Sequence, residues 1–125
     1  MQIYKSAEDY LETILVLAKK KGNVRAIDIA NELNYKRSSV SVAMKNLRNE
    51  NYIEVSESGY ITLTDKGAEI ARNIYDRHTM LTKLLECIGV GHETAEKDAC
   101  KIEHDLSNET IIALRKVHKK LTEQA

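Results

Sequence analysis

The sequence contains no proline, no tryptophan and no phenylalanine among its 125 residues, and only five glycines. Sandwiches and barrels of many strands need frequent turn residues, so this composition favours helices joined by short turns. Lysine and arginine number 19 and equal the 19 acidic residues, so the net charge argues neither for nor against nucleic acid. With 42% hydrophobic residues, the chain is long enough for one domain or for two small lobes.

Long apolar runs are also missing. No stretch approaches the roughly 18 residues needed to cross a bilayer, and the first ten residues lack the apolar segment of a signal peptide. We therefore expect a cytoplasmic protein without a membrane partner. Two cysteines, Cys87 and Cys100, are too few for a disulfide scaffold, and we expect them to be free thiols or metal ligands. Cys87 lies in the apolar run 84–88 and is predicted to be a buried core thiol.

The first half of the chain predicts a helix-turn-helix followed by a hairpin. A capping-box pattern at 6–9 opens a helix predicted for about 6–21, which Gly22 ends. Two short helices are predicted next, at about 27–34 and 38–50. Short alternating runs at 53–55 and 60–63 flank a turn and predict a β-hairpin, the wing of a winged helix-turn-helix.

The second half predicts three further helices, and the fold class is mainly α with a small β-hairpin. A long helix is expected at about 65–88, followed by helices at 94–106 and 107–121, with Ala95, Ala99, Ile102 and Leu106 on one apolar stripe. We expect a winged helix-turn-helix domain at 1–64 and a helical domain at 65–125. A second lobe of this size is more plausibly completed by a symmetry mate, so we expect a homodimer.

Positive charge gathers on the second helix of the predicted pair. Residues 34–52 contain four basic residues and one acidic residue, a local excess of three positive charges in a chain of zero net charge. Serine hydroxyls and backbone amides at the start of a helix can contact phosphates, while longer side chains reach base edges. An ordinary helix with serine caps would look similar, but the wing that follows favours DNA. The candidate DNA-binding residues are Lys36, Arg37, Ser38, Ser39, Ser41, Val42 and Lys45.

The predicted wing itself carries Glu54 and Glu57 and no basic residue. Phosphate contacts depend on lysine and arginine, so we do not expect strong phosphate contacts from the wing.

A second group of residues has the spacing of metal ligands. On a helix, Cys100, Glu103 and His104 would present a thiolate, a carboxylate and an imidazole on one face. Asp9 and Glu12 are also three residues apart, and His78 lies in the long helix. Together these side chains could offer sulfur, nitrogen and oxygen donors to a divalent transition metal. Each also has an ordinary structural role open to it, such as a first-turn acid near the helix dipole or a small buried thiol.

These patterns in combination resemble the diphtheria toxin repressor family of metal-dependent transcriptional regulators. The resemblance is carried by Ser-Ala-Glu-Asp-Tyr-Leu-Glu-Thr-Ile at 6–14, Ser-Ser-Val-Ser at 38–41, Leu-Thr-Asp-Lys-Gly at 63–67, Asp-Arg-His at 76–78 and Cys-Lys-Ile-Glu-His-Asp-Leu-Ser at 100–107. It spans nearly the whole chain.

The resemblance implies a dimeric repressor whose metal site is shared by three helices. The residues that match ligands are Asp9, Glu12, His78, Cys100, Glu103 and His104, with Glu96 near a secondary ligand position. Without the third, SH3-like domain of longer members, the layout is similar to the manganese transport regulators. Asp9 with Glu12 is the manganese-type pairing, whereas Cys100 is the iron-type residue. The metal is therefore expected to be Mn²⁺ or Fe²⁺, and Zn²⁺ or Co²⁺ are expected to bind in vitro.

The resulting hypothesis is a repressor, not an enzyme, that binds a palindromic double-stranded operator and controls genes of metal uptake. The metal acts as corepressor by narrowing the angle between the two lobes. One alternative is a winged-helix regulator that senses oxidants through Cys100. A metalloenzyme is a weaker alternative, because the sequence offers neither a glycine-rich phosphate loop nor a separate nucleophile and base.

Overall fold

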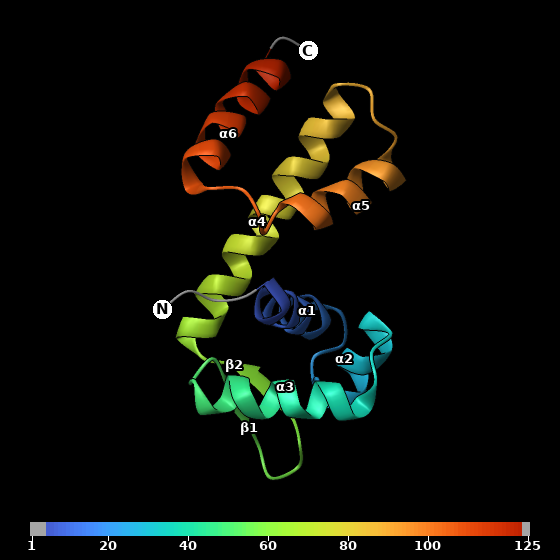
Figure 1. Cartoon of the computed structure of the whole chain (residues 1–125), viewed down its shortest axis with the longest axis vertical. Coiled ribbons are helices and arrows are strands. Elements are labelled where there is room, and N and C mark those ends of the chain that lie inside the picture. The colour runs from blue at the N-terminus through green and yellow to red at the C-terminus, as the bar shows by residue number, and fades with distance from the viewer. Residues whose placement is uncertain (1–4, 124–125) are drawn as a thin grey trace. The chain divides into compact units, whose positions relative to one another are not determined.

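The computed structural model describes residues 5–123 and contains, within that range, six helices and one two-stranded hairpin (Figure 1). The elements run in the order α1 (Lys5–Lys21), α2 (Ala26–Leu33), α3 (Arg37–Asn49), β1 (Ile53–Val55), β2 (Ile61–Leu63), α4 (Asp65–Cys87), α5 (His92–Ile102) and α6 (Asn108–Glu123). The predicted fold class is confirmed. The prediction was wrong about α5, which begins two residues earlier and ends four residues earlier than expected.

The contacts divide the chain into two compact units, one reaching to Arg72 and the other beginning at Asn73. The division falls within α4. These contacts alone do not test the expected domain boundary between residues 64 and 65, which stays a prediction. Each unit is described separately below.

The first unit packs α1, α2, α3 and the hairpin around one apolar core. Leu11 and Ile14 of α1, Ile29 of α2 and Val40 of α3 are almost completely buried. Met44 and Leu47, one and two turns after Val40, are also buried, so one face of α3 packs into the core. The opposite face of α3 is left at the surface.

The turn between α2 and α3 depends on a left-handed residue. Asn34 has φ 58° and ψ 44°, and its backbone N–H donates to the carbonyl oxygen of Ala30. Asparagine tolerates this conformation better than most residues, so it ends α2 and turns the chain into α3.

The hairpin is antiparallel, with Ile53 opposite Leu63 and Val55 opposite Ile61. A third segment joins it, because the Ile61 N–H donates to the Val24 carbonyl at 2.7 Å. Ile53 and Ile61 are buried, whereas Glu54 and Thr62 between them are exposed, as alternation along a strand requires. The expected wing is confirmed, and the loop before α2 belongs to it.

The segment after the wing is locked by Thr64. Its hydroxyl donates to the Asn51 carbonyl at 2.7 Å and accepts the Gly67 N–H at 3.1 Å, so it caps the start of α4. Gly67 packs so closely that a Cβ there would overlap the carbonyl oxygen of Tyr52. Glycine is therefore required at position 67 by this close approach. The side chain of Lys66 also contacts Tyr52, with its ammonium 4.3 Å from the centre of the ring.

The second unit has a smaller core between α4, α5 and α6. Met80, Leu81 and Leu84 of α4 pack against Ala99 of α5 and Ile111 of α6, with Leu106, Leu114 and Leu121 partly buried around them. On the predicted stripe of α5, Ala95 and Ala99 are buried but Ile102 is 37% exposed. The last turn of α4 extends past this core, and Cys87 is exposed rather than buried as predicted.

Among the described residues, no helix has the length and apolar character needed to span a membrane.

The Gly67 contact predicts a position-specific loss of stability. Gly67→Ala should lower the free energy of unfolding by about 3 kcal/mol, because the new methyl group would meet backbone rather than a flexible side chain. Gly91→Ala is the matched control: a Cβ at Gly91 meets nothing within 4 Å, and its cost at a helix N-cap should stay below about 1 kcal/mol. Urea denaturation of both variants measures this, and equal losses would contradict the proposed close approach.

Candidate metal centre and DNA interface

The outer face of α3 presents every side chain that the sequence analysis selected for DNA. Helix α3 begins at Arg37, and Lys36 is its N-cap in an extended conformation with no side-chain cap. The exposed residues are Lys36, Arg37, Ser38, Ser39, Ser41, Val42 and Lys45. Val42 is the most exposed large hydrophobic residue of this helix, at 61%. The helix thus offers hydroxyl, cationic and apolar contacts to solvent, while its other face is fixed in the core.

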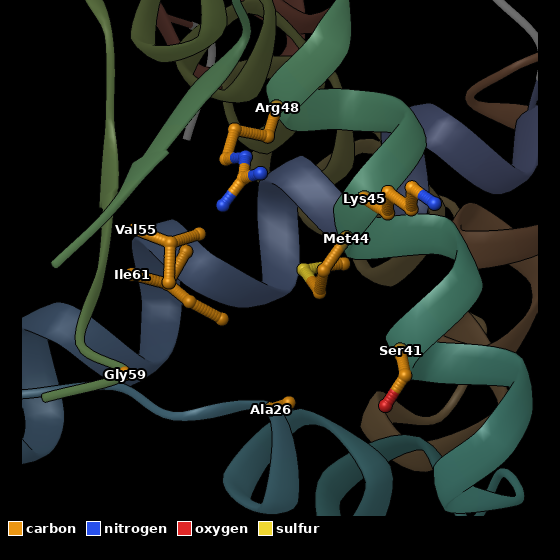
Figure 2. Close-up of a pocket in the computed structure, with 8 residues that line it drawn as sticks. All are labelled: Ala26, Ser41, Met44, Lys45, Arg48, Val55, Gly59 and Ile61. Atoms are coloured by element: carbon orange, nitrogen blue, oxygen red, sulfur yellow. The ribbon is translucent and has the colours of Figure 1, made fainter. Parts of the chain in front are cut away.

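A groove of about 380 Å³ separates α3 from the hairpin. Figure 2 shows its walls, with α3 on one side and the hairpin on the other. It is lined by Ala26, Ser41, Met44, Lys45, Arg48, Val55, Gly59 and Ile61. Its floor is apolar, and its polar groups come from α3.

In the second unit, a fully buried carboxylate lies between two imidazoles. Glu103 is 0% exposed. Its Oε2 lies 2.8 Å from Nδ1 of His78 on α4, and its Oε1 lies 3.3 Å from Nε2 of His104. The His104 side chain is 1% exposed and that of His78 is 22% exposed. Glu103 Oε1 makes no hydrogen bond within residues 5–123, although it faces His104.

The charge state of Glu103 follows from these neighbours. Burial raises the pKa of the carboxyl, but the contacts with His104 and His78 outweigh burial and hold the pKa below its usual value. Glu103 is therefore a carboxylate at neutral pH. A buried anion next to two imidazoles, with one oxygen short of a hydrogen bond, is an arrangement that a divalent cation stabilises.

Arg77 holds the backbone that carries this carboxylate. It is buried on α4, and its Nη1 donates to the Glu103 carbonyl at 3.1 Å and to the Leu106 carbonyl at 2.9 Å. Its Nη2 donates to the side-chain oxygen of Asn108 at the start of α6. A cation at the carboxyl end of α5 also favours the helix dipole. Arg77 lies in the Asp-Arg-His motif at 76–78, and its position beside His78 is the sequence signal that points to this role.

The first unit holds the two remaining predicted carboxylates. Asp9 and Glu12 are both half-buried on α1, three residues apart and so on one face of that helix. They belong to the same unit as α3.

Cys100 and Glu96 do not belong to the group of buried donors. Cys100 is exposed on α5, and within the described range it belongs to no group of three closely spaced metal donors. Glu96 is also outside every such group; its carboxylate lies 3.5 Å from His92 Nε2. The hydrogen bond from His92 to Glu86 raises the pKa of His92. A ligand role for Cys100 or Glu96 stays a prediction.

The early end of α5 explains part of this difference. The helix ends at Ile102, and Glu103 is its C-cap with nearly helical φ and ψ of −59° and −28°. His104 follows in a turn rather than on the predicted helix 94–106. The side chains of Glu103 and His104 nevertheless lie close together, because both reach the same buried site from the turn.

Fold and site together define a class: a winged-helix DNA-binding unit joined to a helical unit that carries buried carboxylate and imidazole donors. Two family models match the chain. The N-terminal DNA-binding domain of the iron dependent repressor matches residues 2–60, and its metal binding and dimerisation domain matches residues 64–124.

Individual relatives agree with these models. An uncharacterised HTH-type transcriptional regulator of Methanocaldococcus jannaschii is 38% identical over 112 residues, which cover 88% of this chain and 90% of the relative. The HTH-type transcriptional regulator MntR of Geobacillus kaustophilus is 37% identical over 102 residues, 82% of this chain and 72% of the relative. The crystal structure of IdeR from T. acidophilum is 32% identical with a TM-score of 0.76, over 91% of this chain and 53% of that one.

The chain therefore belongs to the diphtheria toxin repressor family of metal-dependent transcriptional regulators, which are not enzymes. The expected family is confirmed. The chain spans about half the length of the IdeR structure that it matches.

The three hydrogen bonds of Arg77 predict a large loss on its removal. Arg77→Met should destabilise the protein by about 3 kcal/mol, because two carbonyl groups and an amide oxygen lose a charged donor. Arg115→Met changes an exposed arginine of α6 in the same way and should cost less than about 0.5 kcal/mol. Denaturant unfolding of both variants makes the comparison; a loss below 1 kcal/mol for Arg77→Met would contradict the assigned role.

Proposed function

We propose that this protein is a transcriptional repressor that binds operator DNA when Mn²⁺ or Fe²⁺ occupies a site built around Glu103. The observation that carries the proposal is the buried Glu103 carboxylate flanked by two imidazoles in a chain that also holds a winged helix. Carboxylate and imidazole donors suit first-row divalent metals, and Zn²⁺ or Co²⁺ should also bind in vitro.

The proposed ligands come from both units. His78, Glu103 and His104 belong to the second unit, and Asp9 and Glu12 to the first. Cys100 completes the proposed set, with Glu96 as an accessory ligand. A thiolate there would favour Fe²⁺ over Mn²⁺, so the metal preference depends on whether Cys100 turns inward when the ion binds.

The proposed mechanism is a reduction of conformational freedom. An ion held by ligands of both units would supply the positive charge that balances their carboxylates, and it would restrict the motion of one unit relative to the other. In a dimer, the two α3 helices must fall about 34 Å apart, or a multiple of it, to enter successive major grooves. A narrower distribution of orientations raises DNA affinity without any contact between metal and DNA.

The homodimer fits the surface of the second unit. The family model names this region a dimerisation domain. Ile88, Ile112 and Val117 are 64%, 54% and 47% exposed there, which is apolar surface that a second copy could cover. A two-fold dimer would read a palindromic operator, and we propose that the operator is palindromic. We further propose that the protein acts in the cytoplasm on genes of metal uptake.

A redox role remains a second candidate because Cys100 is exposed. An exposed thiol can react with peroxide, and its oxidation would alter a neighbouring metal site. Cys100→Ser separates the two functions. A redox sensor would lose its response to peroxide, whereas a metal sensor would keep metal-dependent DNA binding with an altered order of metals.

Removal of the central donors should uncouple DNA binding from metal. Fluorescence anisotropy with a labelled duplex, selected by the protein from a random library, should show at least a tenfold rise in affinity with Mn²⁺ or Fe²⁺, about 1.4 kcal/mol. Glu103→Ala and His104→Ala should bind DNA equally with and without metal. Glu93→Ala removes an exposed acid of α5 and should respond as the wild type does. Unchanged metal dependence in both ligand variants would overturn the assignment.

A further inference from the structure

Helix α3 carries one apolar residue on a face that is otherwise polar. The structure describes all of Arg37–Asn49, and apart from Val42 the exposed side chains of this helix are those of arginine, serine, lysine and asparagine. Val42 is 61% exposed, whereas the other large hydrophobic residues of the helix, Val40, Met44 and Leu47, are at most 5% exposed. Single hydrophobic residues are common on protein surfaces, so the position of Val42 on the helix decides whether it can meet a ligand.

Val42 lies opposite the buried face of α3. Successive residues of an α-helix are about 100° apart, so Val42 is about 160° from both Val40 and Met44 around the helix axis. It is also the sixth residue of α3. The N-terminal residues of a recognition helix are the ones that contact base edges in the major groove. Val42 therefore occupies a position from which a side chain reaches the bases.

The neighbours of Val42 leave room for a base edge. One turn toward the N-terminus lie Ser38 and Ser39, which are both exposed and both short. Side chains on a helix lean toward its N-terminus, so the isopropyl group of Val42 covers the turn that carries these serines. A valine in a helix keeps one strongly preferred χ1 rotamer. Little side-chain entropy is therefore lost when its methyl groups make a contact.

The chemistry of valine favours one feature of the major groove. All four bases present hydrogen-bond donors or acceptors there, but only thymine adds an apolar C5-methyl group. Valine can neither donate nor accept a hydrogen bond from its side chain. Against a polar base edge it would remove water without replacing the lost hydrogen bonds, which costs free energy. Against a thymine methyl group it removes the apolar surface of both partners from water, which is favourable.

We propose that Val42 contacts the C5-methyl group of a thymine in the major groove and thereby specifies an A·T pair at one position of each operator half-site. This inference rests on the proposed DNA-binding function, and it adds to that function one base and the side chain that recognises it. Cations such as Arg37 and Lys45 can bind phosphates of any sequence, so Val42 contributes sequence preference rather than most of the affinity.

Uracil is the matched probe, because it pairs with adenine as thymine does and lacks only the C5-methyl group. The loss of one buried methyl group should lower the affinity about fourfold. When the thymines of both half-sites of a palindrome are replaced, the loss should be about fifteenfold, since the two contacts are distant and independent.

The experiment is fluorescence anisotropy with the full chain at saturating Mn²⁺, on the duplex that the protein selects from a random library. Each thymine is replaced by uracil in turn, together with its symmetry mate. The wild type should lose about fifteenfold in affinity at the pair of thymines that Val42 contacts. At the same pair, Val42→Ala should bind the thymine and uracil duplexes equally to within a factor of about two, because its side chain is too short to reach the methyl group.

Two further variants serve as controls. Val42→Ile keeps a branched apolar side chain and should keep the preference for thymine. Lys45→Ala removes a cation from the same helix and should weaken binding to the thymine and uracil duplexes by the same factor, because a charge does not detect a methyl group. Circular dichroism checks folding; because Val42 is exposed and alanine favours helices, Val42→Ala should fold as the wild type does.

Two results would overturn the inference. One is wild-type binding that changes less than about twofold at every thymine of the selected duplex. The other is a preference for thymine in Val42→Ala equal to that of the wild type, which would assign the effect to the shape or stiffness of the duplex. The proposed function is tested separately by titrations without metal. Wild-type binding that does not respond to Mn²⁺ would refute that function and leave the preference for thymine measurable.

Discussion

The structure depends on one buried carboxylate. Glu103 is fully enclosed, and two imidazoles outweigh the cost of its burial and keep it ionised. A buried charge of this kind is expensive unless its partners are held in place, and Arg77 holds the backbone on which Glu103 lies. The proposed metal site therefore depends on hydrogen bonds from a residue that is not itself a proposed ligand. A site built in this way keeps its donors together before any ion binds.

In the DNA-binding unit, too, buried residues hold the exposed groups in place. The buried face of α3 fixes the helix, and Thr64 and Gly67 fix the exit of the wing. The groove between them takes its charged groups, Lys45 and Arg48, from α3. Val24 pairs with Ile61 and so places Arg25 next to Tyr60 of the wing, which shows how a contact between backbone atoms decides where an exposed side chain lies.

Much of this fold could be predicted from the sequence, because its signals are local. Helical periodicity located α1, α3 and α6 to within two residues, and the alternation around the turn at 56–59 located the wing. Features that depend on tertiary contacts were missed. The end of α5 was misplaced because the segment that follows Ile102 makes tertiary hydrogen bonds, with the Glu103 and Leu106 carbonyls accepting from Arg77. Cys87 was expected in the core, but it is exposed at the end of α4. The ligand types came from residue spacing, which does not reveal that Cys100 is exposed.

If metal and DNA bind to one coupled system, each must change the affinity of the other, and thermodynamic linkage makes this coupling measurable. Isothermal titration of Mn²⁺ into the protein alone and into its complex with the selected duplex yields the factor by which DNA tightens metal binding. Thermodynamic reciprocity requires this factor to equal the one by which Mn²⁺ tightens DNA binding, and we predict that both are at least tenfold. If Mn²⁺ binds the free protein and the complex with the same affinity, the ion is not a corepressor and the account is contradicted.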